Sequence, residues 1–117
     1  GQYYNSKGSI LARIGRFDES FAAFAKAIEL EPNNALFLES LGFAYVDLGN
    51  KLNEDATYLD NKAYAKAKVE IDAAYKNALP YFEKAYELEP DNYSFKHSLR
   101  SLYYRLGMND KYEALAD

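Results

Sequence analysis

The chain has 117 residues, a net charge of −4 at pH 7 and 49% hydrophobic residues, which is enough for one domain with a single core. The acidic balance and the mixed distribution of charges argue against nucleic-acid binding, which needs lysine and arginine gathered on one face. The absence of cysteine excludes disulfides and thiolate chemistry, and no run of about 18 uncharged apolar residues predicts a membrane span.

The first element is a repeat unit that returns after 34 residues. A period of this length is typical of stacked helical hairpins, each too small to bury its apolar face alone. We therefore expect a pair of helices in residues 1–34, and the paired acids Asp18 and Glu19 fit the start of its second helix better than a role as general acids. The recurring residues are Gly8, Leu11 and Gly15 in the first copy and Gly42, Tyr45 and Gly49 in the second.

The second copy, residues 35–92, contains an insertion. Gly42 and Pro90 are 48 residues apart, whereas Gly8 and Pro32 are 24 apart, which leaves 24 inserted residues. Two apolar stripes with helical spacing run into the insertion from both sides. The first stripe comprises Tyr45, Leu48, Leu52, Ala56 and Leu59, and the second comprises Tyr64, Ala67, Ile71, Ala74 or Tyr75, Ala78, Phe82 and Ala85.

These stripes predict that both helices of the second hairpin are lengthened, each by about 12 residues or roughly 18 Å. Asp60 and Asn61 lie between the stripes and are suitable N-caps for the second helix. Pro80 falls inside that helix, where its ring displaces the carbonyl of Lys76. We expect a kink near Leu79, and the alternative is a break that makes the inserted region a separate short helix.

A third, partial copy occupies residues 93–117. It has Tyr93, Leu99, Tyr103 and Gly107 at repeat positions, but Arg100 stands where the other copies have glycine. The short third copy and the absence of an initial methionine lead us to expect a piece cut from a longer protein, with a removed leader as the alternative.

The residues at these positions resemble the tetratricopeptide repeat (TPR) family, with Lys7 and Ser20 as departures from the usual leucine and alanine. The resemblance implies an all-α, TPR-like stack of antiparallel helix pairs in which the second hairpin is elongated. In the first copy it rests on Gly8, Leu11, Gly15, Phe17, Phe24, Ala27, Ile28, Leu30 and Pro32.

The C-terminal part resembles one bacterial subgroup of this family, common in Bacteroidetes, in which a lengthened hairpin precedes a similar tail. The subgroup resemblance implies a generic binding role without an assigned chemistry. It rests on the segments NALPYFEKAYELEPDN, LYYRLGM and KYEALAD.

Catalysis has little support in the sequence. His97 is the one histidine, and no Gly-Xaa-Ser-Xaa-Gly elbow or phosphate-binding glycine loop occurs. Glu54, Asp55 and Asp60 lack the spacing of a calcium loop. We therefore expect no cofactor, no metal and no enzymatic activity, with a site built from Glu, Tyr or His97 in the groove as a remote alternative.

The resemblance also implies a binding face formed by the first helix of each pair, suited to a protein or peptide with apolar anchors and an acidic end. Packing against a neighbouring repeat is the alternative role for the same side chains. The candidate residues are Asn5, Ser9, Arg13, Leu36, Glu39, Phe43, Val46, His97, Ser101, Tyr104 and Arg105, and the same offsets add Gln2, Ala12, Asp47 and Ser94.

Two further expectations concern partners. The clamp of lysine, asparagine and arginine by which chaperone-binding members hold a terminal carboxylate is absent, because the matching positions are Asn5, Ser9, Ser40, His97 and Ser101.

The inserted hairpin carries three tyrosines that either fill its core or form an assembly surface. Self-assembly through this hairpin or the truncated end is therefore an alternative function, and the sequence leaves the compartment open between cytoplasm and periplasm. The three tyrosines are Tyr58, Tyr64 and Tyr75.

Overall fold

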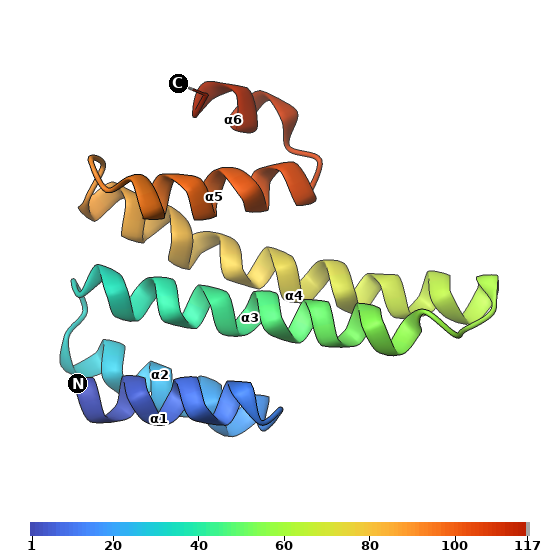
Figure 1. Ribbon diagram of the computed structural model, residues 1–117, viewed down its shortest axis with the longest axis horizontal. Helices are drawn as coiled ribbons and strands as arrows, with labels where there is room; N and C mark the ends of the chain where they lie inside the picture. Colours follow the sequence, from blue (N-terminus) through green and yellow to red (C-terminus); the bar gives the residue numbers. More distant parts are fainter. Residues whose placement is uncertain (117) are drawn as a thin grey trace.

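The computed structural model describes residues 1–116, and within them every regular element is an α-helix. Figure 1 shows the helices as successive antiparallel pairs stacked in chain order. This arrangement confirms the predicted all-α, TPR-like stack. The helices are α1 (Gln2–Arg13), α2 (Phe17–Leu30), α3 (Ala35–Ala56), α4 (Asn61–Leu88), α5 (Tyr93–Arg105) and α6 (Asn109–Ala114).

The first hairpin is held together by close contact between α1 and α2. Gly8 is buried, and a Cβ atom at this position would lie 2.9 Å from the ring of Phe24, so only glycine allows the two helices to approach this closely. Ser20 is fully buried, and its Oγ donates a 2.7 Å hydrogen bond to the carbonyl oxygen of Gly8. Gly15 turns the chain between the helices with a φ of +84°, a conformation that glycine adopts without strain.

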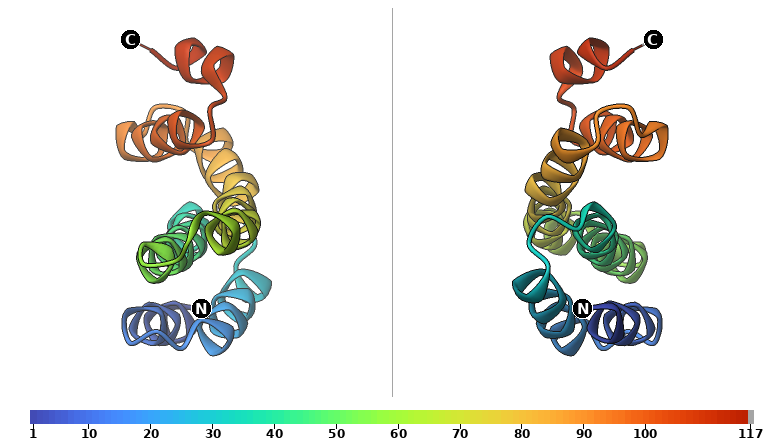
Figure 2. Two further views of the ribbon diagram at one scale, coloured as in Figure 1. Left: turned by 90° about the vertical axis from the view of Figure 1, so that its right-hand side faces the viewer. Right: turned by 90° about the vertical axis from the view of Figure 1, so that its left-hand side faces the viewer.

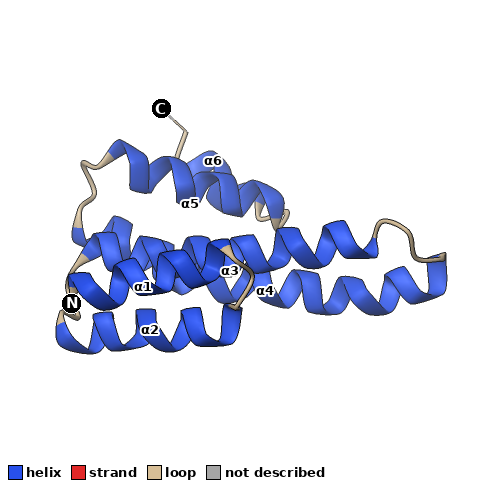
Figure 3. Cartoon of the chain, turned by 60° about the horizontal axis from the view of Figure 1, so that its bottom comes forward, coloured by secondary structure: helices blue, strands red, loops and turns tan. Residues whose placement is uncertain are grey.

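The second hairpin is much longer than the first. Its helices α3 and α4 have 22 and 28 residues, compared with 12 and 14 in α1 and α2. The Oδ1 atom of Asp60 accepts a 2.8 Å hydrogen bond from the backbone N–H of Ala63, which confirms the predicted N-cap of α4. Figure 3 shows the far half of this hairpin projecting beyond the other helices.

The predicted stripes of the long hairpin are correct except at its tip. Leu59 was expected on the stripe of α3, but the helix ends at Ala56 and Leu59 is 45% exposed in the connection. Tyr64 begins the stripe of α4 and is 37% exposed. Of the three tyrosines on the inserted segment, Tyr75 is buried in the core and Tyr58 is 93% exposed. The tip therefore lies beyond the reach of the shared core.

Pro80 lies inside α4 without interrupting it, so the alternative of a separate short helix is wrong. Figure 1 shows α4 as one helix that curves toward α5 along its C-terminal half. Pro80 is exposed, so its ring stays out of the core.

The stack has two rows of helices. Figure 2 shows α1, α3 and α5 in one row and α2 and α4 in the other. The largest buried cluster joins Tyr75, Ala78 and Phe82 of α4 to Leu99 and Leu102 of α5. The row of first helices is the face on which the candidate binding residues lie.

Candidate functional site

The candidate residues come from three helices of the same row. Most of them are exposed or half-buried, whereas Ala12, expected at this surface, is buried at 8% exposure. The alternative role as packing residues is thus correct for Ala12. The exposed or half-buried candidates are Asn5, Ser9 and Arg13 on α1, Leu36, Glu39, Phe43 and Val46 on α3, and His97, Ser101, Tyr104 and Arg105 on α5.

Phe43 occupies the centre of this surface. Its side chain is 44% exposed, and its ring meets that of Phe82 edge to face with centroids 5.1 Å apart. One cavity of about 290 Å³ lies between Phe43 and α1. A second cavity of about 260 Å³ lies between Phe43 and α5. The ring therefore separates two hollows, and we call the row of cavities along α1, α3 and α5 the groove.

The two hollows have different linings. The hollow toward α1 is more polar and includes Ser9, Arg13, Ser40 and Asp47. The hollow toward α5 has an apolar floor and a polar rim without a carboxylate. Its lining consists of Phe43, Val46, Phe82, His97, Ser98, Ser101, Leu102 and Arg105.

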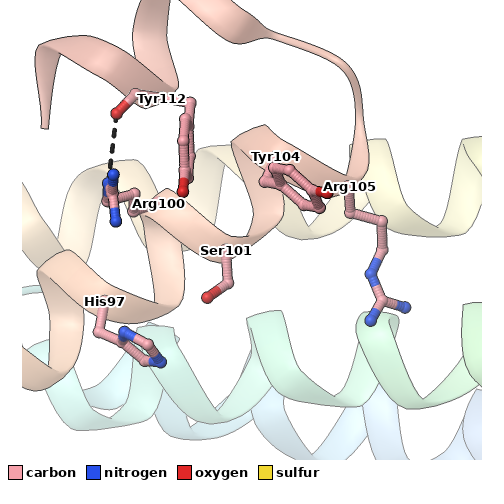
Figure 4. A pocket seen from close by; sticks show the side chains of 6 residues that line it. All are labelled: His97, Arg100, Ser101, Tyr104, Arg105 and Tyr112. Atoms are coloured by element: carbon pink, nitrogen blue, oxygen red, sulfur yellow. Dashed lines mark hydrogen bonds between the residues drawn. The ribbon is translucent and has the colours of Figure 1, made fainter. Parts of the chain in front are cut away.

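A third cavity of about 410 Å³ continues the groove between α5 and α6. Figure 4 shows the side chains of His97, Ser101 and Arg105 along α5, with Arg100 and Tyr112 at the α6 side. The Arg100 guanidinium lies 4.0 Å from the centroid of the Tyr112 ring. Nε of Arg100 also donates a 3.4 Å hydrogen bond to the backbone carbonyl oxygen of Tyr112.

The sequence prediction missed the contributions of Arg100 and Tyr112 to this cavity. The one available indication was that Arg100 replaces the glycine of the other copies. Where Gly8 and Gly42 admit the rings of Phe24 and Phe82, Arg100 instead places a long charged side chain against α6. Arg100 therefore lines the cavity between α5 and α6 together with Tyr112.

Arg105 is a candidate at the edge of the groove, and it also joins three helices. Its Nη1 donates hydrogen bonds to Oδ1 of Asn50 at 2.6 Å and to the hydroxyl of Tyr75 at 2.8 Å. The Tyr75 hydroxyl donates to the same Asn50 oxygen at 2.7 Å. The guanidinium also lies 4.7 Å from the centroid of the Tyr75 ring. Arg105 therefore has a structural role in addition to its place in the cavity linings.

Two carboxylates of α3 are close to the cavities: Asp47 lines the hollow toward α1, and Glu39 lies beside the groove. Oε2 of Glu39 accepts a 3.3 Å hydrogen bond from Ser98 Oγ, and partial burial raises the pKa of Glu39 despite this bond. Partial burial likewise raises the pKa of Asp47. Burial therefore disfavours the charged form of both carboxylates relative to water.

The remaining candidates do not all join the cavities. Leu36 is 62% exposed and lines none of the cavities described above. Asn5 borders none of these cavities, and its Oδ1 is buried without a hydrogen-bond partner among the described residues. Tyr104 is 68% exposed and borders only the third cavity. The structure thus gathers Phe43, Val46 and the α5 candidates into one surface and leaves Leu36 and Asn5 outside it.

Within residues 1–116, no group of three or more histidine or acidic side chains is placed to hold a metal ion. In the same part of the chain, no helix is both long and apolar enough to cross a membrane. The two cavities beside α5 combine apolar side chains with hydroxyl groups and arginine side chains.

Comparison with known families finds two matches. Residues 8–49 match a family described as TPR repeat, and residues 73–92 match one described as tetratricopeptide repeat. The interval between them holds the C-terminal end of α3, the tip of the long hairpin and the start of α4. No curated protein matches the chain significantly.

Together the two matches cover more than half of the chain. The first spans α2 with parts of α1 and α3, and the second spans the C-terminal part of α4. Repeats of this family generally mediate protein–protein interactions and typically serve as noncatalytic scaffolds. On the evidence of the repeat period, the helical stack and these matches, the chain belongs to the tetratricopeptide repeat family.

Proposed function

We propose that the groove binds a peptide segment of a partner protein, as a noncatalytic module of a larger scaffold. The observation that carries this proposal is the hollow between Phe43 and α5, because its apolar floor is open to solvent beside polar side chains. Exposed aromatic rings surrounded by polar groups are typical of peptide-binding surfaces. Phe43 serves as the central contact for an apolar side chain of the peptide.

The charge of the groove favours an acidic end of the bound peptide. His97, Arg100 and Arg105 line the third cavity, and no carboxylate is among its lining residues. This concentration of donors stands out in a chain whose net charge is −4. An apolar side chain at Phe43 and an acidic group toward α6 therefore orient the peptide along the row of first helices.

A library of displayed random peptides provides a direct test. We expect the protein to select peptides that combine an apolar anchor with acidic residues, and we expect Phe43→Glu to lose them. Val69→Glu is the matched control, because Val69 is 70% exposed on α4 and outside the groove. Equal binding by Phe43→Glu and the control, or selection of basic peptides only, would contradict the proposal.

The exposed tip of the long hairpin supports a second candidate function, self-assembly. Tyr58 is 93% exposed and Leu59 is 45% exposed, on a projection that Figure 3 shows clear of the stack. Sedimentation over a range of concentrations tests this function. A concentration-dependent dimer that Tyr58→Asp and Leu59→Asp abolish would support it, whereas a monomer at every concentration would exclude it.

We also infer that the chain comes from the bacterial subgroup with an elongated hairpin. The 22- and 28-residue helices α3 and α4, followed by the tail that begins at Asn77, support this placement. A survey of genomes for chains that combine both features tests it, and their absence from bacteria would contradict it.

A further inference from the structure

Arg13 and Asp47 are two oppositely charged side chains that line the same hollow without forming an ion pair. The hollow toward α1, of about 290 Å³, has both residues in its lining. Arg13 comes from the end of α1 and Asp47 from α3, which Figure 2 shows in the same row of helices. Among the described residues, neither side chain has an ion-pair or hydrogen-bond partner.

A neighbouring cavity of about 430 Å³ shares this charged pair. Its lining also includes Lys51 and Glu54, which lie beyond Gly49 in the lengthened part of α3. Neither Lys51 nor Glu54 lines the hollow, so Arg13 and Asp47 are its charged residues. The two cavities adjoin at the pair, which is therefore open to the groove and to the side of the long hairpin.

The two charged side chains have opposite hydrogen-bonding capacities. An arginine guanidinium only donates hydrogen bonds, and a carboxylate only accepts them. Partial burial raises the pKa of Asp47, and no neighbouring cation reverses this effect. A cationic ligand would be attracted by Asp47 and repelled by Arg13, and an anionic ligand would meet the reverse. A neutral group that both donates and accepts suits both side chains.

The hydroxyl groups of the hollow favour the same kind of ligand. Ser40 Oγ donates a 2.9 Å hydrogen bond to the carbonyl oxygen of Leu36, so toward the hollow it is left as an acceptor. Ser9 lines the wall formed by α1, and its hydroxyl both donates and accepts. A carboxamide has one carbonyl oxygen and two N–H groups. These groups match one donor, Arg13, and two acceptors, Asp47 and Ser40.

We propose that this hollow binds the side-chain carboxamide of an asparagine or glutamine in the bound peptide. The carboxamide oxygen accepts from Arg13, and the N–H groups donate to Asp47 and Ser40. This inference rests on the proposed peptide-binding function and adds a third requirement to the apolar anchor at Phe43 and the acidic group toward α6. The carboxamide lies on the α1 side of the anchor, away from the acidic group.

A side-chain amide suits the hollow better than a main-chain amide. An extended peptide that follows the row of first helices directs its main-chain N–H and C=O groups perpendicular to its own direction. Arg13 and Asp47 follow each other along that direction, because they belong to successive helices of the row. A side chain that enters between α1 and α3 instead directs its terminal oxygen toward one helix and its nitrogen toward the other.

A displayed library of random peptides, selected on wild-type protein and on charge-reversed variants, tests this inference. Wild-type protein is expected to enrich asparagine or glutamine at a fixed distance from the apolar anchor, on the side away from the acidic residues. Asp47→Lys should change this preference to acidic residues, and Arg13→Glu should change it to basic residues. Lys66→Glu is the control, because Lys66 is exposed on α4 and lines none of the cavities. Every variant should retain the apolar anchor.

Affinities of synthetic peptides give the second measurement. The enriched peptide is compared with a version in which the carboxamide residue is replaced by the acid of the same size, and with one in which it is replaced by leucine or methionine. Fluorescence anisotropy should show about tenfold weaker binding of both versions to wild-type protein. Arg13 and Asp47 are exposed, and circular dichroism checks that their variants are folded.

The results separate this inference from the proposed function. Selection of no peptide by the wild-type protein would overturn both. Selected peptides that share the apolar anchor and acidic residues but lack a carboxamide would overturn this inference alone. It would also fail if the carboxamide preference persisted in both charge-reversed variants. Equal affinity for the leucine or methionine version would contradict it too, because the pair would then bind the peptide main chain or nothing.

Discussion

The ring of Tyr75 on α4 lies against the backbone of Gly49 on α3, so that a Cβ atom at residue 49 would stand 2.6 Å from Cε1 of the ring. Gly15 and Gly107 hold the matching position in the other two hairpins, where they end α1 and α5 with φ values of +84° and +72°. In the long hairpin the glycine lies inside α3 instead. Glycine is required at this position for a turn in two hairpins and for close helix packing in the third.

Gly49→Ala is expected to destabilise the protein by about 1–2 kcal/mol, because the cost of overpacking against a buried ring exceeds the gain in helix propensity. Urea unfolding measures the change. In a Tyr75→Ala background the same substitution should stabilise the protein, since the ring that it meets is gone. A stabilising effect of Gly49→Ala in the wild-type background would show that α3 and α4 are less closely packed than described.

Arg105→Ala is expected to lower the free energy of unfolding by about 1–2 kcal/mol, because it removes both hydrogen bonds and the ring contact that join α5 to Asn50 and Tyr75. Arg13→Ala is the control, since Arg13 is an exposed arginine at the end of α1 and should change stability by less than about 0.5 kcal/mol. Equal effects of the two substitutions in chemical denaturation would exclude the structural role of Arg105.

Ser20→Ala introduces the residue that the family usually carries, yet we expect it to destabilise this chain by about 1 kcal/mol. The Ser20 hydroxyl is fully buried and donates to the carbonyl of Gly8, and its loss leaves a small gap between α1 and α2. Thermal unfolding followed by circular dichroism checks the effect. An unchanged or higher midpoint would mean that the hydrogen bond contributes nothing to stability.

Asp47→Asn is expected to stabilise the protein at pH 7 and not at pH 3. Burial raises the pKa of Asp47 above the ordinary value of 3.8 for an aspartate, so the folded state binds the proton more tightly than the unfolded state. The protonated carboxyl group of Asp47 contributes stability at pH values below its pKa in the unfolded state. This contribution is lost as the pH rises through the pKa of Asp47 in the folded state. The effect is small, because Asp47 remains largely exposed to solvent.

Urea titrations at the two pH values measure the difference for Asp47→Asn. Asp55→Asn is the control, because Asp55 is exposed and its carboxylate forms an ion pair with Lys51 at 3.2 Å. This control should not gain stability at pH 7. A gain for Asp47→Asn that is the same at both pH values would point to a cause other than its charge.

The repeat offsets predict surface residues only on the first helix of each pair. The repeat offsets placed Phe43, Val46 and the α5 candidates on one face, and the structure brings them together around shared cavities. The offsets did not reveal Tyr112, because that residue reaches the surface from α6. The repeat offsets also gave no sign that Arg105 binds Asn50, since the insertion changes which residues of α3 lie beside α5. The role of the candidate residues in binding stays a prediction.

The sequence by itself determined the helix pairs, the length of the second hairpin and the cap at Asp60, because these depend on apolar spacing and on local hydrogen bonding along one segment. Only the tertiary structure decided that Gly49 packs against Tyr75, that Arg105 joins three helices, and that Tyr58 lies in solvent. A periodic pattern shows which side chains share a face of a helix. The distance and angle between helices then decide which neighbour, if any, covers that face.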